Sequence, residues 1–344
     1  MARATKQPGT TQQRATLPIS VVLIPSLNLP SYPRLLAGFR GNVWYNNLKE
    51  KETALNSTVK EITIDAAGFQ LAALHKAAKT DAGAGTAPRL LCIHGWLDNA
   101  NSFLPLFPHL DDFEIVAIDL PGHGHSSAIG DTAFYHLLDA GLLLPRIVDA
   151  LGWQHCHLIG HSLGGNLSTI AAVASAEHFL SLVLLESLGP LTEPAEKLPE
   201  RLMKALQHRT NPERFDSRTF DDPQQAVESR LAAAKMTQRA AELIIERQVK
   251  AVPGGWQWCF DPKQRMASSV YLSEEQALVL LASLSLRTLV VLAEDGYLVN
   301  RDETEQRLAH IPKLEKVSVP GNHHMHMDDP QPTAQVLCNF LRNM

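Results

Sequence analysis

Six short apolar runs, separated by stretches with helical periodicity, constrain the fold of this chain more than any other sequence feature. The runs span residues 90–93, 115–118, 157–159, 182–185, 289–292 and 317–319. Short, continuously apolar runs are typical of strands that are buried on both faces of a parallel sheet. Helical patterns such as 132–151 and 163–177 lie between them. This order predicts an α/β fold with a mostly parallel central sheet flanked by helices, and with ligand chemistry at the carboxyl ends of the strands.

Two interruptions of this order predict the domain organisation. Residues 1–57 are rich in Pro, Thr, Gln and Asn and lack periodicity, so we expect an N-terminal extension that is at most partly ordered. Alternating segments around a turn at residues 65–68 then predict a β-hairpin. Residues 190–284, which include a charged amphipathic stretch at 232–249, predict an inserted helical cap or lid. The expected core is therefore 58–189 together with 285–344.

Composition restricts the partners and cofactors. The net charge is −5 and the basic residues are scattered, which argues against nucleic acid as a partner. Four widely separated cysteines lack the spacing of zinc or redox sites, and we expect no cofactor and no metal. An apolar stretch at residues 17–29 is broken by prolines and is too short to span a membrane. We expect a cytoplasmic protein, with a secretory signal as the weaker alternative; the oligomeric state is left open.

The strongest chemical signal is Gly160-His161-Ser162-Leu163-Gly164-Gly165, which follows one apolar run and opens a helical stretch. A nucleophile elbow requires this strand–turn–helix context. Small residues on both sides let the backbone turn sharply, so that the Ser162 oxygen faces the cleft. By itself the pattern also fits a glycine-rich turn in which Ser162 merely caps a helix.

Three further motifs occur in a matching order. His94-Gly95-Trp96 and the loop from Asp119 to Ser126 follow two other apolar runs, and Gly321-Asn322-His323 follows the last. Together with the elbow, they resemble the α/β-hydrolase superfamily from residue 59 to the C-terminus. That superfamily includes esterases, lipases, thioesterases, carbon–carbon bond hydrolases and haloperoxidases. Its epoxide hydrolases and haloalkane dehalogenases use an aspartate nucleophile, so Ser162 argues against these two. Residues 256–276 also resemble the cap of the serine hydrolase-like subgroup.

The resemblance implies roles for several residues. His323 matches the general base, His324 is a near competitor, and His326 matches a second, structural histidine. A serine nucleophile needs such a base, and the oxyanion that forms needs two donors. The backbone N–H groups of Leu163 and Trp96 match those donors.

The acid of the triad is where this sequence departs from the usual superfamily pattern. Alignment of Leu298-Val299 with the usual apolar pair places Gly296 at the acid's position, and Asp295 lies one residue early. Glu186 ends the apolar run 182–185, the place where some haloalkane dehalogenases and related luciferases carry a glutamate. A buried charge at a strand end is costly unless it is paired. We therefore predict Glu186 as the acid and keep Asp295 as the alternative.

The sequence thus predicts a serine hydrolase that cleaves a small-molecule carboxylic ester or thioester through an acyl-enzyme, with a carboxylesterase as the first expectation. Trp256, Trp258 and Tyr271 are candidate substrate-binding residues of the cap. A cofactor-free perhydrolase or haloperoxidase, or a carbon–carbon bond hydrolase, would use the same triad. A non-catalytic binding protein of this fold is the alternative of another class, and the missing carboxylate at Gly296 is the one hint of it.

Overall fold

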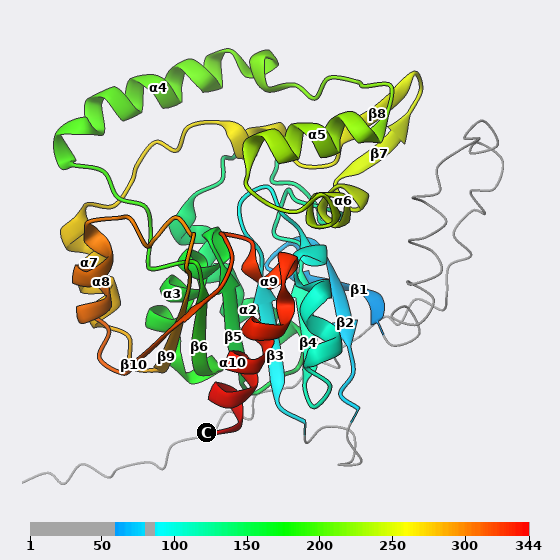
Figure 1. Ribbon diagram of the computed structural model, residues 1–344. Coiled ribbons are helices and arrows are strands. Elements are labelled where there is room, and N and C mark those ends of the chain that lie inside the picture. The colour runs from blue at the N-terminus through cyan, green and yellow to red at the C-terminus, as the bar shows by residue number, and fades with distance from the viewer. Residues whose placement is uncertain (1–58, 80–86, 344) are drawn as a thin grey trace, which may run out of the picture. The chain divides into compact units, whose positions relative to one another are not determined.

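A computed structural model describes residues 59–79 and 87–343, so the predicted extension 1–57 lies outside the described residues. Its centre is an eight-stranded sheet in the order β1-β2-β4-β3-β5-β6-β9-β10 (Figure 1). The strands are β1 (Val59–Ala66), β2 (Phe69–Lys76), β3 (Arg89–Ile93), β4 (Glu114–Ile118), β5 (Cys156–His161), β6 (Phe179–Leu185), β9 (Arg287–Ala293) and β10 (Leu314–Val319). All six apolar runs form strands of this sheet.

The sheet is parallel except at one edge. β1 and β2 form the predicted hairpin, and β2 also pairs antiparallel with β4. From β4 to β10 all neighbouring strands are parallel. The carboxyl ends of these strands therefore meet at one edge of the sheet, and the loops that carry the motifs leave from that edge. The predicted α/β class is confirmed.

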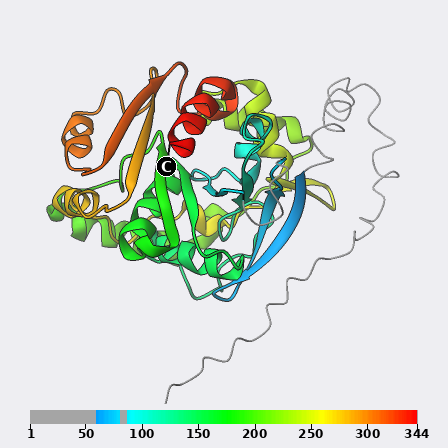
Figure 2. The same ribbon diagram turned by 90° about the horizontal axis from the view of Figure 1, so that it is seen from below.

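Both faces of the sheet are covered, which explains why the strands are continuously apolar (Figure 2). Leu182 and Leu184 pack in one cluster with α2 (Leu137–Ala150), α3 (Leu163–Ala174) and α8 (Glu303–Ala309). Val183 and Leu185 pack in the opposite cluster with the 3₁₀ segment η1 (Ala100–His109) and α10 (Pro330–Arg342). Alternate residues of one strand thus enter two separate cores.

The insertion between β6 and β9 lies over the strand ends for most of its length (Figure 1). It contains α4 (Leu198–Thr210), α5 (Pro223–Ala233), α6 (Gln238–Glu246) and the hairpin of β7 (Val249–Val252) and β8 (Gly255–Trp258). The insertion also contains the short 3₁₀ turns η3 (Ala195–Lys197), η4 (Pro212–Phe215) and η5 (Pro262–Arg265), whereas a further turn, η2 (Ala176–His178), precedes β6. Its last helix, α7 (Glu274–Ala282), instead packs Leu281 into the core beside α3.

Three expected helix boundaries are corrected. The helix expected at 132–151 begins at Leu137, because Tyr135 lies in the preceding loop, where its hydroxyl donates to Asp261 at 2.8 Å. The helix expected at 163–177 ends at Ala174, and Ser175 has non-helical backbone angles, with φ −154° and ψ 62°. The stretch 232–249 is not one helix. α5 ends at Ala233, and α6 begins after Thr237, whose side chain caps the new helix.

No helix among residues 59–79 and 87–343 is long and apolar enough to cross a membrane. All four cysteines are free thiols; Cys92 and Cys156 are buried in the core.

Candidate active site

Ser162 occupies a strained turn between β5 and α3. Its φ is 50° and its ψ is −117°, a backbone conformation that residues other than glycine rarely adopt. The neighbouring glycines make the turn sterically feasible. A β-carbon at Gly164 would lie 2.0 Å from the carbonyl oxygen of Ile93, and one at Gly160 would lie 2.5 Å from the backbone of Gly164. The structure thus has the geometry of a nucleophile elbow at Ser162.

The two expected oxyanion donors lie at the first residue of α3 and in the loop after β3. Leu163 is the first residue of α3, so its N–H has no partner within the helix. Trp96 lies in the loop after β3, where its indole donates to the Gln264 carbonyl at 2.9 Å. In the described part of the chain, neither the Trp96 nor the Leu163 amide donates to a backbone oxygen. Both amides are therefore available to an oxygen of a ligand.

His323 lies in the loop after β10 and faces Glu186. Its Nδ1 is 3.4 Å from Oε2 of Glu186, the long end of the hydrogen-bond range. A proton on Nδ1 that points to this carboxylate leaves the lone pair on Nε2, the arrangement that a general base needs. The Ser162 hydroxyl forms no hydrogen bond to any described residue, and such contacts often tighten only when substrate binds.

Glu186 is held rigidly at the end of β6. Its φ is 47° and the residue is only 2% exposed. The carboxylate accepts hydrogen bonds from the amides of Ala293 at 2.8 Å and Tyr297 at 2.9 Å. Burial alone would raise the pKa of Glu186, but the hydrogen bonds from His323 and from these two amides outweigh it and lower the pKa. The carboxylate is therefore ionised where it meets the imidazole.

Gly296 explains how this carboxylate fits. A β-carbon at Gly296 would lie 2.4 Å from the carboxyl carbon and from both carboxyl oxygens of Glu186. The position that lacks an acid is thus the position over which the Glu186 carboxylate rests. Asp295, by contrast, is exposed, and within the described ranges its side chain forms no hydrogen bond or ion pair with His323.

Comparison with known proteins agrees with this geometry. A family model for the alpha/beta hydrolase fold matches residues 88–330. The chain belongs to the alpha/beta hydrolase family. Serine hydrolase-like protein 2 of Homo sapiens is 30% identical over 282 residues, which cover 76% of this chain and 88% of the relative. The serine hydrolase-like protein of Danio rerio is 29% identical over 270 residues, covering 74% and 81% respectively.

A solved structure matches equally broadly. The crystal structure of the hypothetical protein PA1622 from Pseudomonas aeruginosa PAO1 has a TM-score of 0.77 and 33% identity, and the match covers 82% of this chain and 99% of that one. The expectation of an α/β-hydrolase superfamily serine hydrolase is confirmed, and the hydrolase acts on a small molecule.

A buried polar cluster behind the elbow of this hydrolase was only partly foreseen. His161, the residue before Ser162, donates from Nε2 to the carbonyl oxygen of His323 at 2.8 Å and so joins the elbow to the histidine loop. Burial lowers the pKa of His161 to about 4, although the nearby Asp98 partly offsets this effect. Asp98 also pairs with Arg230 of α5. In the sequence, Asp98 is marked only by its place two residues after Trp96.

Other members of the motifs hold the loops together. Asp119 accepts hydrogen bonds from the amides of Ala100 and His125 and from Nε of Arg247, each at 2.8 Å. His94 accepts from the amide of Leu120 at 3.0 Å. Arg247 follows α6, so the insertion itself stabilises the loop after β4. The sequence did not single out Arg247.

The three candidate substrate-binding residues lie in the insertion. Trp256 and Trp258 are on β8, and Trp258 packs in the insertion's own hydrophobic cluster against Phe220. The guanidinium of Arg201 lies over the ring of Tyr271, with its central carbon 4.1 Å from the ring centroid. Tyr271 is 38% exposed. Phe220 and Arg201, which contact Trp258 and Tyr271, also belong to the insertion.

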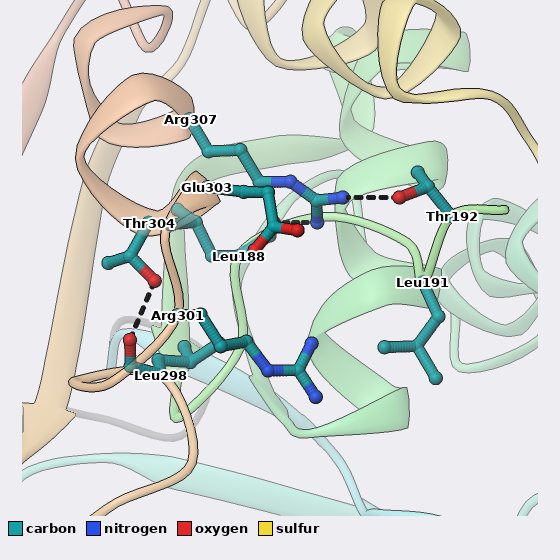
Figure 3. A pocket seen from close by; sticks show the side chains of 8 residues that line it. All are labelled: Leu188, Leu191, Thr192, Leu298, Arg301, Glu303, Thr304 and Arg307. Atoms are coloured by element: carbon teal, nitrogen blue, oxygen red, sulfur yellow. Dashed lines mark hydrogen bonds between the residues drawn. The ribbon is translucent and has the colours of Figure 1, made fainter. Parts of the chain in front are cut away.

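A separate pocket lies where the insertion leaves the core (Figure 3). Its lining consists of Leu188, Leu191, Thr192, Leu298, Arg301, Glu303, Thr304 and Arg307. Arg307 spans one side and donates to the carbonyl oxygens of Leu188 and Pro190 and to Thr192. Neither Ser162 nor His323 lines this pocket, so it is distinct from the candidate site.

Proposed function

We propose that this hydrolase cleaves a carboxylic ester or thioester through an acyl-enzyme on Ser162, and that a carboxylic ester is its first substrate class. The observation that carries the proposal is the ionised Glu186 carboxylate, which lies over Gly296 and faces Nδ1 of His323 at 3.4 Å. This contact supports a nucleophile–base–acid set of Ser162, His323 and Glu186, although the usual acid position holds glycine. It also weakens the one hint of a non-catalytic protein.

The reaction follows from the positions of these groups. Nε2 of His323 takes the Ser162 proton while Oγ attacks the carbonyl carbon. The amides of Leu163 and Trp96 donate to the oxyanion. The imidazolium then gives its proton to the leaving oxygen or sulfur, and the acyl group stays on Oγ. Water repeats the sequence, with His323 again accepting and returning a proton, and releases the acid.

We further propose that residues 190–284 roof the site, with Trp256, Trp258 and Tyr271 contributing to the choice of substrate. Apolar walls with a few polar groups are typical of small-molecule pockets. Two contacts of the insertion with the strand-end loops support this position. Asn99, in the loop after β3, donates to the Ile244 carbonyl of α6 at 2.8 Å, and Arg247 donates to Asp119 after β4 at 2.8 Å.

Fluorophosphonate labelling tests the nucleophile directly. The purified protein should be labelled at Ser162 and lose its activity on p-nitrophenyl esters. Ser162→Ala should remain unlabelled and inactive, whereas Ser285→Ala, an exposed serine, should behave like the parent. Labelling of the Ser162→Ala variant, or substantial turnover by it, would show that another residue is the nucleophile.

A panel of matched substrates tests the substrate class. p-Nitrophenyl esters of increasing chain length and the corresponding thioesters would be compared by kcat/KM on one preparation. Faster turnover of esters supports a carboxylesterase, and faster turnover of thioesters points to a thioesterase. No turnover of either, despite fluorophosphonate labelling, would reject both substrate classes.

A further inference from the structure

Three side chains from different segments converge behind the elbow. Asp98 lies in the loop after β3, His161 ends β5, and His324 lies in the loop after β10. Oδ2 of Asp98 is 3.5 Å from Nδ1 of His161 and 3.6 Å from Nε2 of His324. The three ligand atoms all lie within 4.8 Å of one another. These separations are too long for good hydrogen bonds.

The proton positions leave electron pairs facing one another. Nε2 of His161 donates to a carbonyl oxygen, which can only accept, so this nitrogen carries the proton. In the neutral ring Nδ1 then presents a lone pair to Oδ2 of Asp98. Arg230 pairs with the other carboxylate oxygen, Oδ1, and leaves Oδ2 for the histidines. Two acceptors in this position call for a cation between them.

The burial of these three side chains strengthens the case for a bound cation. Asp98, His161 and His324 are 1%, 0% and 3% exposed. Of the three ligand atoms, Nδ1 of His161 is buried without a hydrogen-bond partner among the described residues. Buried polar atoms without partners are rare and indicate a missing water or ion. Gly95 leaves the room, because a β-carbon there would lie 2.8 Å from Oδ2 of Asp98 and 3.0 Å from Nδ1 of His161.

Two of the three separations between ligand atoms suit a tetrahedral metal site. Two ligands that each lie ~2.1 Å from a tetrahedral Zn²⁺ are about 3.4 Å apart, which is close to the 3.5 and 3.6 Å separations here. Metal-ligating histidines also commonly donate their second N–H to a backbone carbonyl. His161 does so, and the carbonyl belongs to His323.

We infer that Asp98, His161 and His324 bind a divalent transition-metal ion, with Zn²⁺ as the ion that best suits one carboxylate and two imidazoles. The ion would join the loop after β3, the elbow and the histidine loop. Because the three ligands are buried, the ion has a structural role and does not contact substrate. This inference departs from the expectation, made from the sequence, of no metal, and it does not depend on which ester is cleaved.

Metal binding to the folded protein tests the inference without any substrate. Protein freed of metal by chelation would be titrated with Co²⁺, followed by its visible absorption, and with Zn²⁺ in competition. One equivalent should bind and give the spectrum of a tetrahedral site, and Zn²⁺ should raise Tm. An anomalous difference map of Zn²⁺-soaked crystals should show the ion between the three ligand atoms. A map with only a water there, or with zinc only on exposed histidines, would overturn the inference.

Variants sharpen the test. His324→Gln removes one ligand and should weaken the apparent Kd by roughly 100-fold or more, whereas His155→Gln, an exposed histidine, should leave it unchanged. Arg230→Gln removes the cation that shares Asp98 and should tighten binding on the order of tenfold. A variant that merely loosened the fold would weaken binding instead. Equal Kd values for the parent and for His324→Gln would reject the site even if the wild-type protein binds metal.

Discussion

The ends of β6 and β9 each carry a carboxylate at the same edge of the sheet, but the two carboxylates are in opposite environments. Glu186 at the end of β6 is buried, has a positive φ and accepts two backbone hydrogen bonds. Asp295, after β9, is exposed, and its one hydrogen bond with the residues that the structure describes runs from its amide to the Gly321 carbonyl. Our proposal of Glu186 as the acid therefore rests on its backbone donors and on the cleared volume over Gly296, and not only on a place at the carboxyl end of a parallel strand.

The comparison also indicates how the carboxylate can come from the end of β6 instead of the end of β9 while the histidine keeps its place. The Glu186 carboxylate is bound by amides of the β9 end, at Ala293 and Tyr297, so it occupies the space that a side chain at Gly296 would fill. The longer glutamate chain covers the distance from the neighbouring strand. We therefore expect that a carboxylate from either strand can reach the same imidazole nitrogen.

Exchange of the two carboxylates for amides should give the largest effect. Glu186→Gln is expected to lower kcat by roughly 10³ to 10⁴, as when a triad carboxylate becomes an amide, because the imidazolium loses its partner. Asp295→Asn should cost about tenfold or less. Both variants would be measured on one p-nitrophenyl ester, with the fold checked by circular dichroism. The reverse ranking would make Asp295 the acid.

Addition of a single methyl group at Gly296 should give the next largest effect. In Gly296→Ala the new carbon would lie 2.4 Å from the carboxyl group, so Glu186 must shift away from His323. A misplacement of about 1 Å can cost ~10² in rate, and we expect kcat to fall by about that factor. Gly130→Ala is the matched control, since a β-carbon there has no neighbour within 4 Å. Unchanged kcat in Gly296→Ala would contradict the proposed role of the Glu186 carboxylate.

Relocation of the acid should give a smaller, opposite effect. Glu186→Ala empties the space over Gly296, and Gly296→Asp, added to it, returns a carboxylate from β9. The double variant should regain on the order of tenfold in kcat over Glu186→Ala alone. Gly296→Asn in the same background controls for shape without charge. If Gly296→Asn restored kcat as much as Gly296→Asp does, the position would need volume and not a negative charge.

Much of this site was predictable because its signals are local. The elbow glycines, the apolar runs and the histidine loop follow from steric and packing rules that act within a few residues. Glu186 was also predictable, since a carboxylate that ends a buried run needs a partner. The empty position at Gly296 looked like a defect in sequence, and only the structure shows that the Glu186 carboxylate lies over it.

The features that the sequence did not predict depend on tertiary contacts. The start of α2 is set by the Tyr135 contact with Asp261, which lies 126 positions away. The break between α5 and α6 is stabilised by Thr237, whose hydroxyl donates to Asp328 at 2.7 Å. Asp98 and Arg230 are 132 positions apart and meet only in the folded protein. The hydrophobic periodicity of a single segment contains no information about such long-range pairs.

The smallest expected effect is a difference in acid stability between the two strand ends. The pKa of Glu186 is lowered in the folded protein from the ordinary 4.5, because the hydrogen bonds from His323 and the two amides outweigh burial. The unfolded state therefore binds more protons just below pH 4.5, so the contribution of Glu186 to stability is present above that pH and is lost as the pH falls further.

This stability difference can be isolated by subtraction. Urea unfolding from pH 6 to pH 3 should show the free-energy gap between the parent and Glu186→Gln shrinking as the pH drops below about 4.5, whereas Asp295→Asn should run parallel to the parent. Burial lowers the pKa of His94 to about 4 and that of His123 to about 3, so all three proteins lose stability as these rings become protonated in the unfolded state. Because the histidines are common to all, their contribution cancels in the difference. A gap that stays constant over the whole range would mean that the lowered pKa of Glu186 does not stabilise the fold.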